Sequence, residues 1–253
     1  RPVYACLFAV VRMVVVVFVF LSVRRPPRFR QGRSSAGSAV YKRQSVDETT
    51  TKIATGSAAV VDASQWDLNS NSSRLGFKGA REVSAGLEVI YQMEFQVYYD
   101  DGASSSSKGS DTFEQRNIFA GLKGSFGTII AGKHDTPLKL AQGKVDRFSD
   151  LVLGDIKNYM EGEDRASNII MYTTPDLSGF SATVALIPGE DAVNENDGVA
   201  DGTSVSVSYK QEAFKVSIAQ NSEVDNQDAV RLAGDFSVGQ STTLGFLVQS
   251  TEV

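Results

Sequence analysis

Residues 87–99 read LEVIYQMEFQVYY, and hydrophobic side chains alternate with mostly polar ones through this stretch. One side holds Leu87, Val89, Tyr91, Met93, Phe95, Val97 and Tyr99, and the other holds Glu88, Gln92, Glu94 and Gln96, with Ile90 and Tyr98 as exceptions. Successive side chains of a β-strand point to opposite faces, whereas a helix repeats about every 3.6 residues. The stretch therefore predicts one long β-strand with an apolar face and a polar face.

The same two-residue period recurs along the chain, while no helical pattern of useful length is present apart from a turn or two inside 138–160. We predict about eleven strands, near 53–62, 73–79, 86–99, 113–123, 127–134, 166–174, 179–187, 203–210, 213–221, 229–237 and 242–250. The fold class is therefore all-β.

The connections between these strands alternate in length. The short ones are 80–85, 124–126, 175–178, 211–212 and 238–241, and the long ones are 100–112, 135–165, 188–202 and 222–228. Short turns on one rim and long loops on the other are typical of an antiparallel up-and-down β-barrel in an outer membrane. The polar faces alone also fit a soluble barrel or sandwich, but such a fold has no reason to sort its loops in this way.

The longest connection reads DTPLKLAQGKVDRFSDLVLGDIKNYMEGEDR over residues 135–165, and it is rich in acids. A connection of this length inside a compact domain is usually functional. We predict that loop 136–165 folds into the barrel and faces basic wall residues across a water-filled pore. The bases are Arg74, Arg116, Lys133 and Arg165.

Composition excludes several other functions. The chain has 253 residues, a net charge of −5, one cysteine and one histidine. A disulfide framework and a cysteine-based metal site are therefore impossible, and the acidic body argues against binding nucleic acid. His134 lies at a strand end without a G-x-S-x-G nucleophile motif, so we expect no enzyme, no catalytic residue, no metal and no cofactor.

Residues 1–52 form an atypical segment. An apolar run from Val3 to Val23, broken by Arg12, is long enough to cross a bilayer as a helix. A basic cluster follows this run, although a secretory signal carries its charges before the apolar core. Three interpretations stay open: an irregular signal or anchor, a membrane helix of the mature protein, or sequence that does not belong to the mature protein.

Several motifs together resemble the general diffusion porins of Gram-negative bacteria, in particular those of gammaproteobacteria. These motifs are SRLGFKG at 73–79, LEVIYQMEFQVYYDDG at 87–102, QRNIFAGLKGSFGTIIAGKHDTPLKLAQGKVDRFSD at 115–150 and RASNIIMYTTPDLSGFSA at 165–182. The resemblance implies a transmembrane barrel of the sixteen-stranded porin type. Residues 53–253 are then a partial porin barrel with the inward-folded loop 136–165.

The resemblance also implies site residues and partners. It matches Arg74, Arg116 and Arg165 to the basic ladder of the pore wall, with Lys133 as a further base. Asp146 and Asp150, on either side of Phe148, match the acids of the constriction, whereas Arg147 departs from the family pattern. The implied assembly is a homotrimer in contact with outer-membrane lipid and lipopolysaccharide.

The expected function is passive diffusion of small hydrophilic solutes and ions across the cell outer membrane. Because the chain stops at Val253 without a terminal aromatic strand, we expect it to be incomplete at the C-terminus. The alternative function is that of a β-rich surface adhesin or binding module, anchored by a helix over Val3–Val23 and without transport activity.

Overall fold

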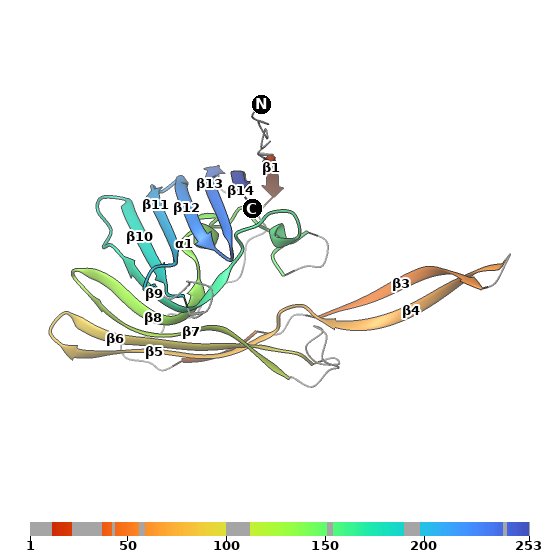
Figure 1. Cartoon of the computed structure of the whole chain (residues 1–253), viewed down its shortest axis with the longest axis horizontal. Coiled ribbons are helices and arrows are strands. Elements are labelled where there is room, and N and C mark those ends of the chain that lie inside the picture. Colours follow the sequence, from red (N-terminus) through yellow and green to blue (C-terminus); the bar gives the residue numbers. More distant parts are fainter. Residues whose placement is uncertain are drawn as a thin grey trace, which may run out of the picture.

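The computed structural model describes residues 12–21, 37–41, 44–55, 59–99, 112–150, 154–189, 198–239 and 242–252. Most of these residues belong to antiparallel strands, which form one large curved sheet and a separate hairpin (Figure 1). The strands are β1 (Arg12–Leu21), β2 (Gly37–Tyr41), β3 (Gln44–Thr55), β4 (Ala59–Ser70), β5 (Arg74–Ser84), β6 (Leu87–Val97), β7 (Phe113–Gly124), β8 (Gly127–Asp135), β9 (Arg165–Thr173), β10 (Phe180–Ile187), β11 (Gly202–Lys210), β12 (Phe214–Val224), β13 (Gln227–Val238) and β14 (Thr242–Glu252).

The large sheet has an up-and-down order. Each strand from β5 to β13 pairs with the next strand along the chain, β1 pairs with β14, and β2 pairs with β5. The strands β1 and β2 are therefore the two edges of the sheet within the described residues. The prediction of an all-β, antiparallel up-and-down barrel wall is confirmed.

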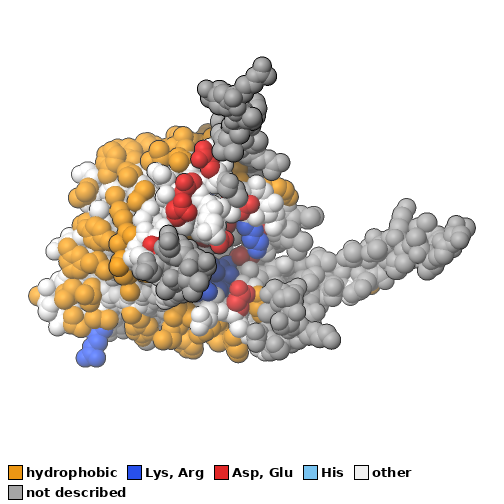
Figure 2. Space-filling view, in the orientation of Figure 1, with side chains coloured by type: hydrophobic (Ala, Val, Ile, Leu, Met, Phe, Trp, Pro, Cys, Tyr) orange, Lys and Arg blue, Asp and Glu red, His pale blue; other side chains and the backbone are white. Residues whose placement is uncertain are grey.

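The two faces of this wall differ in polarity. On β11, Val205 and Val207 are exposed on the outer face, while Ser204 and Ser206 are buried on the inner face. Hydrophobic side chains cover much of the outer surface, and charged side chains gather in the hollow of the sheet (Figure 2). This is the arrangement that a barrel needs when lipid surrounds it and water fills it.

A row of aromatic rings crosses the outer face of β10–β14. Phe180 stacks on Tyr209 with ring centroids 4.3 Å apart, and contacts of 5.7, 5.8 and 6.1 Å continue the row through Phe214, Phe236 and Phe246. Aromatic rings at such positions are typical of the boundary between lipid and water. The row therefore marks the membrane interface near the rim that carries the short turns.

The predicted strands over 73–250 are confirmed with small shifts of their ends, but two other predictions were wrong. The single strand expected over 53–62 is instead divided between two strands, because residues 53–55 end β3 and residues 59–62 begin β4 of a hairpin that projects from the curved sheet (Figure 1). The long loop expected over 222–228 is a two-residue turn, because Asp225 and Asn226 adopt positive φ angles of 55° and 57°. Asp and Asn tolerate this conformation better than other non-glycine residues, and the flanking strands continue up to them.

Within the described residues, the N-terminal apolar run does not form the helix that the adhesin interpretation requires. Residues Arg12–Leu21 are a strand paired with β14 along its whole length. The β-branched run Val14–Val17 favours a strand over a helix. Within the described part of the chain, no helix has the length and hydrophobicity needed to cross a membrane. Residues 3–11 and 22–23 of the proposed anchor lie outside the described residues.

Candidate functional site: a loop held against the inner wall

Loop 136–165 carries two short helices. Thr136 caps α1 (Pro137–Ala141) by accepting a hydrogen bond from the Lys139 backbone, and Asp155 caps the 3₁₀ helix η1 (Ile156–Asn158) in the same way. Proline at the start of α1 fits because the first helical N–H needs no partner within the helix. Local sequence therefore folds the loop into compact pieces rather than an open strand connection.

The described parts of the loop pack on the inner face of the sheet. Leu138 and Ala141 of α1 are buried against Ala219 of β12 and Ala229 of β13. A second cluster buries loop residues against the same part of the wall, and it consists of Val145, Ile156, Met160, Ala233 and Leu247. Small alanines on the wall leave room for the loop, and apolar burial stabilises its position.

A buried arginine fixes the loop to the wall. Arg231 of β13 is fully buried, and its Nη1 lies 2.6 Å from the Glu163 carboxylate. The same guanidinium donates hydrogen bonds to Gln249 Oε1 at 2.7 Å, to the Leu138 carbonyl at 3.3 Å and to the Glu161 carbonyl at 3.1 Å. A buried charge is tolerated only when it is paired and hydrogen-bonded in this way.

On the opposite part of the sheet, two of the predicted basic wall residues form ion pairs with acidic residues. Arg74 of β5 lies 2.6 Å from Asp150 of the loop, and Arg116 of β7 lies 2.8 Å from Glu94 of β6. A register shift places two residues of β7, Arg116 and Asn117, opposite the single residue Glu94. Such a β-bulge re-aims side chains, so both Arg116 and Asn117 reach the inner side.

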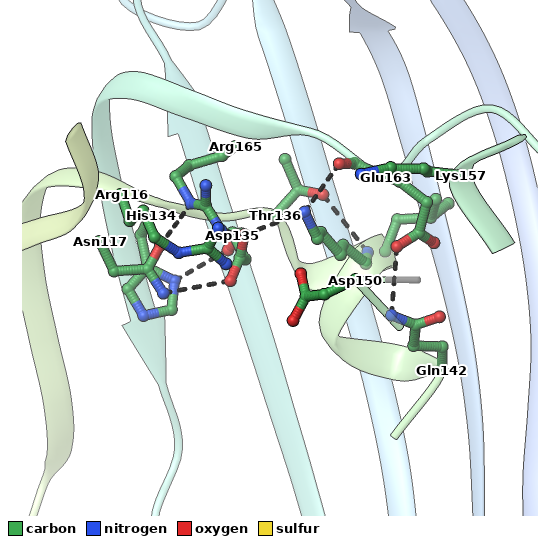
Figure 3. Close-up of polar contacts among 12 residues, drawn as sticks. Arg116, Asn117, His134, Asp135, Thr136, Gln142, Asp150, Lys157, Glu163 and Arg165 are labelled. Atoms are coloured by element: carbon green, nitrogen blue, oxygen red, sulfur yellow. Dashed lines mark hydrogen bonds and ion pairs between the residues drawn. The ribbon is translucent and has the colours of Figure 1, made fainter. Parts of the chain in front are cut away.

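The third predicted arginine belongs to a network at the root of the loop. Arg165 lies 2.9 Å from Asp135 and donates a hydrogen bond of 2.8 Å to Asn117 (Figure 3). Lys139 of α1 lies 3.2 Å from the same Asp135 carboxylate. The two ends of the loop are therefore held together by charges.

These residues surround a polar cavity of about 470 Å³ between the wall and the loop. Its lining includes the bases Arg74, Arg116, Lys139, Lys157 and Arg165 and the acids Glu114, Asp135, Asp146, Asp150, Asp155 and Glu163. Five of the six predicted site residues are in this lining. The sixth, Lys133, lies opposite Ile118 in the sheet and does not line the cavity.

Asp146 and Asp150 differ in their surroundings. Asp150 pairs with the wall, whereas Asp146 accepts hydrogen bonds from the backbone N–H groups of Phe148 at 2.8 Å and Ile156 at 3.3 Å. Burial raises the pKa of Asp146 above its ordinary value, and the neighbouring Asp155 adds to the effect. Burial likewise raises the pKa of Glu163, although Arg231 acts in the opposite direction. Both acids therefore take up a proton more readily than an ordinary carboxylate.

The structure adds residues that the sequence analysis did not select. Glu94, Asn117 and Asp135 join the wall network, and Arg231 anchors the loop. The sequence did contain an indication of Arg231, because this basic residue stands between two alanines, Ala229 and Ala233, on the inner face of its strand. In the described ranges, no group of three or more His, Cys, Asp or Glu side chains could hold a metal ion.

Comparison with known families gives a match over most of the chain. The family described as "Gram-negative porin" matches residues 39–253. The major outer membrane protein P.IB of Neisseria gonorrhoeae is 28% identical over 190 residues, which cover 72% of this chain and 48% of that protein. The outer membrane porin protein 32 of Delftia acidovorans is 25% identical over 197 residues, covering 71% and 55%. The chain thus spans about half the length of the curated relatives it matches.

Two solved structures share the fold. The anion-selective porin from Comamonas acidovorans superposes with a TM-score of 0.60 and 21% identity, covering 87% of this chain and 68% of that one. The OmpF of Salmonella typhi, solved in complex with daunomycin, superposes with a TM-score of 0.58 and 16% identity, covering 84% and 65%. Both similarities support a porin-type sheet.

Proposed function

We propose that this chain, which belongs to the Gram-negative porin family, forms the wall of a passive diffusion channel for small hydrophilic solutes and ions. Its place is the outer membrane, as the names of its relatives indicate. Family membership also agrees with the prediction that the chain carries no enzymatic activity. The single observation that carries the proposal is a charged loop held on the polar inner face of a sheet whose outer face is apolar.

The arrangement of charges suggests how solutes are selected. Arg74, Arg116 and Arg165 lie on the wall, and Asp146 and Asp150 lie on the loop. Separated charges of opposite sign leave an electric field across a narrow, low-dielectric gap. Water and small polar solutes orient in such a field, whereas a large apolar solute must displace oriented water. We propose that this cavity is the constriction of the pore, with Lys133 outside it.

The whole protein is proposed to be a homotrimer that contacts outer-membrane lipid and lipopolysaccharide. The apolar outer face of the sheet supports contact with lipid. The edges β1 and β2 of the described sheet would have to be paired in a membrane, because an open sheet edge is not tolerated in hydrocarbon. The part of the chain given by residues 53–253 would then be one section of a sixteen-stranded wall.

Liposomes test the channel directly. The whole protein, reconstituted into liposomes, should release small sugars and ions at rates that fall with solute size, and it should migrate on gels as an SDS-resistant oligomer that dissociates on heating. A surface adhesin is expected to be inert in the release assay. Liposomes that retain their contents at full protein incorporation would show that the chain is not part of a channel.

The raised pKa values of two acids in the cavity predict that the ion preference of the channel depends on pH. Because the pKa values of Asp146 and Glu163 are raised, these groups lose their negative charge at a higher pH than an ordinary aspartate, whose pKa is about 3.9. Cation preference should therefore begin to fall as the pH drops, before ordinary carboxylates titrate. Reversal potentials between pH 7 and pH 4 measure the effect. An Asp146→Asn variant should show a smaller dependence of cation preference on pH. A cation preference that stays constant over this range would contradict the role of these acids in the constriction.

A further inference from the structure

A second cavity, of about 540 Å³, lies on the inner face of β10–β13, on the side of the loop that faces the short turns. It shares only Leu140 and Gly143 of the loop with the lining of the first cavity. The proposed constriction does not account for it. A solute that has passed the loop would meet this cavity next.

Three lysines give this cavity a basic character. Lys210 of β11 and Lys215 of β12 are direct partners across the two strands, and Lys144 enters from the loop. Like charges placed opposite each other in a sheet are destabilising. Among the described residues, none of the three lysines forms an ion pair within 4.0 Å. An anion between Lys210 and Lys215 would relieve their repulsion.

Two acids in the lining reduce the positive charge of this cavity but do not neutralise it. Asp235 of β13 is the partner of Lys215 on its other side, and Asp176 lies in the turn between β9 and β10. The ammonium of Lys215 and the carboxylate of Asp235 both reach toward Gly143, at 3.6 and 3.7 Å from the point where a Cβ on that glycine would lie. The cavity therefore keeps an excess of positive charge, and an anion would bind without being trapped.

Hydroxyl groups line the wall between the lysines and the loop. They belong to Ser181 and Thr183 of β10 and to Ser206 and Ser208 of β11. Ser208 also shares a hydrogen bond of 2.8 Å with Ser217 of β12. A hydroxyl both donates and accepts hydrogen bonds, so this wall suits a solute that carries hydroxyl groups itself.

We propose that the second cavity is a binding site for small hydroxylated anions of the sugar phosphate class. Lys210 and Lys215 bind the phosphate group, and the serines and the threonine bind the sugar hydroxyls. The volume lies within the range of about 300–1,000 Å³ that is usual for small-molecule sites. This inference rests on the proposed channel function, because the solute reaches the site through the pore. Weak binding also fits transport, since a solute must be able to leave.

Calorimetric titration of the whole protein in detergent tests the site independently of conduction. Glucose 6-phosphate is the probe, with glucose and inorganic phosphate as comparisons. We expect glucose 6-phosphate to bind more tightly than either comparison. Lys210→Gln or Lys215→Gln should each weaken its binding about threefold to fivefold, and the double variant roughly tenfold, as is usual for partly exposed charges.

The matched control is Lys123→Gln, which removes one exposed lysine that lines neither cavity. This variant should bind glucose 6-phosphate as the unaltered protein does. Equal weakening in Lys123→Gln and Lys210→Gln would mean that only overall charge matters, and it would overturn the site. Binding of inorganic phosphate as tight as that of glucose 6-phosphate would overturn the role of the hydroxyls. Intact binding in a protein that fails to conduct would count against the channel function alone.

Discussion

Replacement of Arg231 by methionine is expected to release the loop from the pore wall. The substitution keeps most of the side-chain volume but removes the partner of the buried Glu163 carboxylate and the donor to the Leu138 and Glu161 carbonyls. Leaving one member of a buried ion pair alone costs about 3–5 kcal/mol. Amide exchange in a peptide covering 137–163 should therefore accelerate by at least about 100-fold. Exchange read by mass spectrometry measures this directly, and the open-channel current should become noisier.

Two further variants distinguish loss of the Arg231–Glu163 ion pair from general destabilisation of the protein. Lys157→Met also removes a charge from the loop, but this side chain is largely exposed, and its one ion pair among the described residues is with Asp155 at 3.5 Å, so exchange should stay nearly unchanged. Combining Arg231→Met with Glu163→Gln removes the unpaired carboxylate and should restore part of the protection. The anchor assignment fails if Arg231→Met leaves exchange in the loop peptide as slow as before.

Much of the sheet could be predicted from alternation alone. In β11, valines at every second position and serines between them determined both the strand and its faces, because a strand repeats every two residues. The turn at Asp225–Asn226 was missed because it lies within a longer polar stretch, and polarity alone does not show that only two residues form the turn. The hairpin β3–β4 was missed because its register depends on the partner strand, not on either strand alone.

The site could be predicted only in part. The resemblance to the porin family pointed to Arg74, Arg116 and Arg165 on the wall, and to the acids on either side of Phe148 in the loop. The anchor between Arg231 and Glu163 could not be derived, because it joins residues 68 positions apart in the sequence. The β-bulge at Arg116 and Asn117 could not be predicted either, because a bulge is defined by the pairing of two strands, here with Glu94 on the neighbouring strand. Contacts between distant segments depend on the curvature of the sheet, and local patterns do not contain that information.

Neutralising the wall arginines should shift the ion preference of the channel toward cations. Arg74, Arg116 and Arg165 are half-buried in the cavity lining, and each pairs with an acid that stays in place after substitution by glutamine. Two unit charges about 4 Å apart interact by about 1 kcal/mol even in bulk water, and by more near a protein surface. Removing three positive charges should therefore raise the cation-to-anion permeability ratio on the order of tenfold. Reversal potentials across a planar bilayer with a salt gradient measure the ratio.

A matched triple variant shows whether position or total charge is responsible. Arg81, Lys123 and Lys133 carry the same combined charge but do not line the cavity, so their replacement by glutamine should change the ratio little. The shift in the wall variant should also shrink at high salt, because exposed charges are screened over about 10 Å at 0.1 M. If both triple variants shift the potential equally, selectivity arises from the field of the whole molecule. In that case the cavity between loop and wall is not the constriction, even if the channel conducts normally.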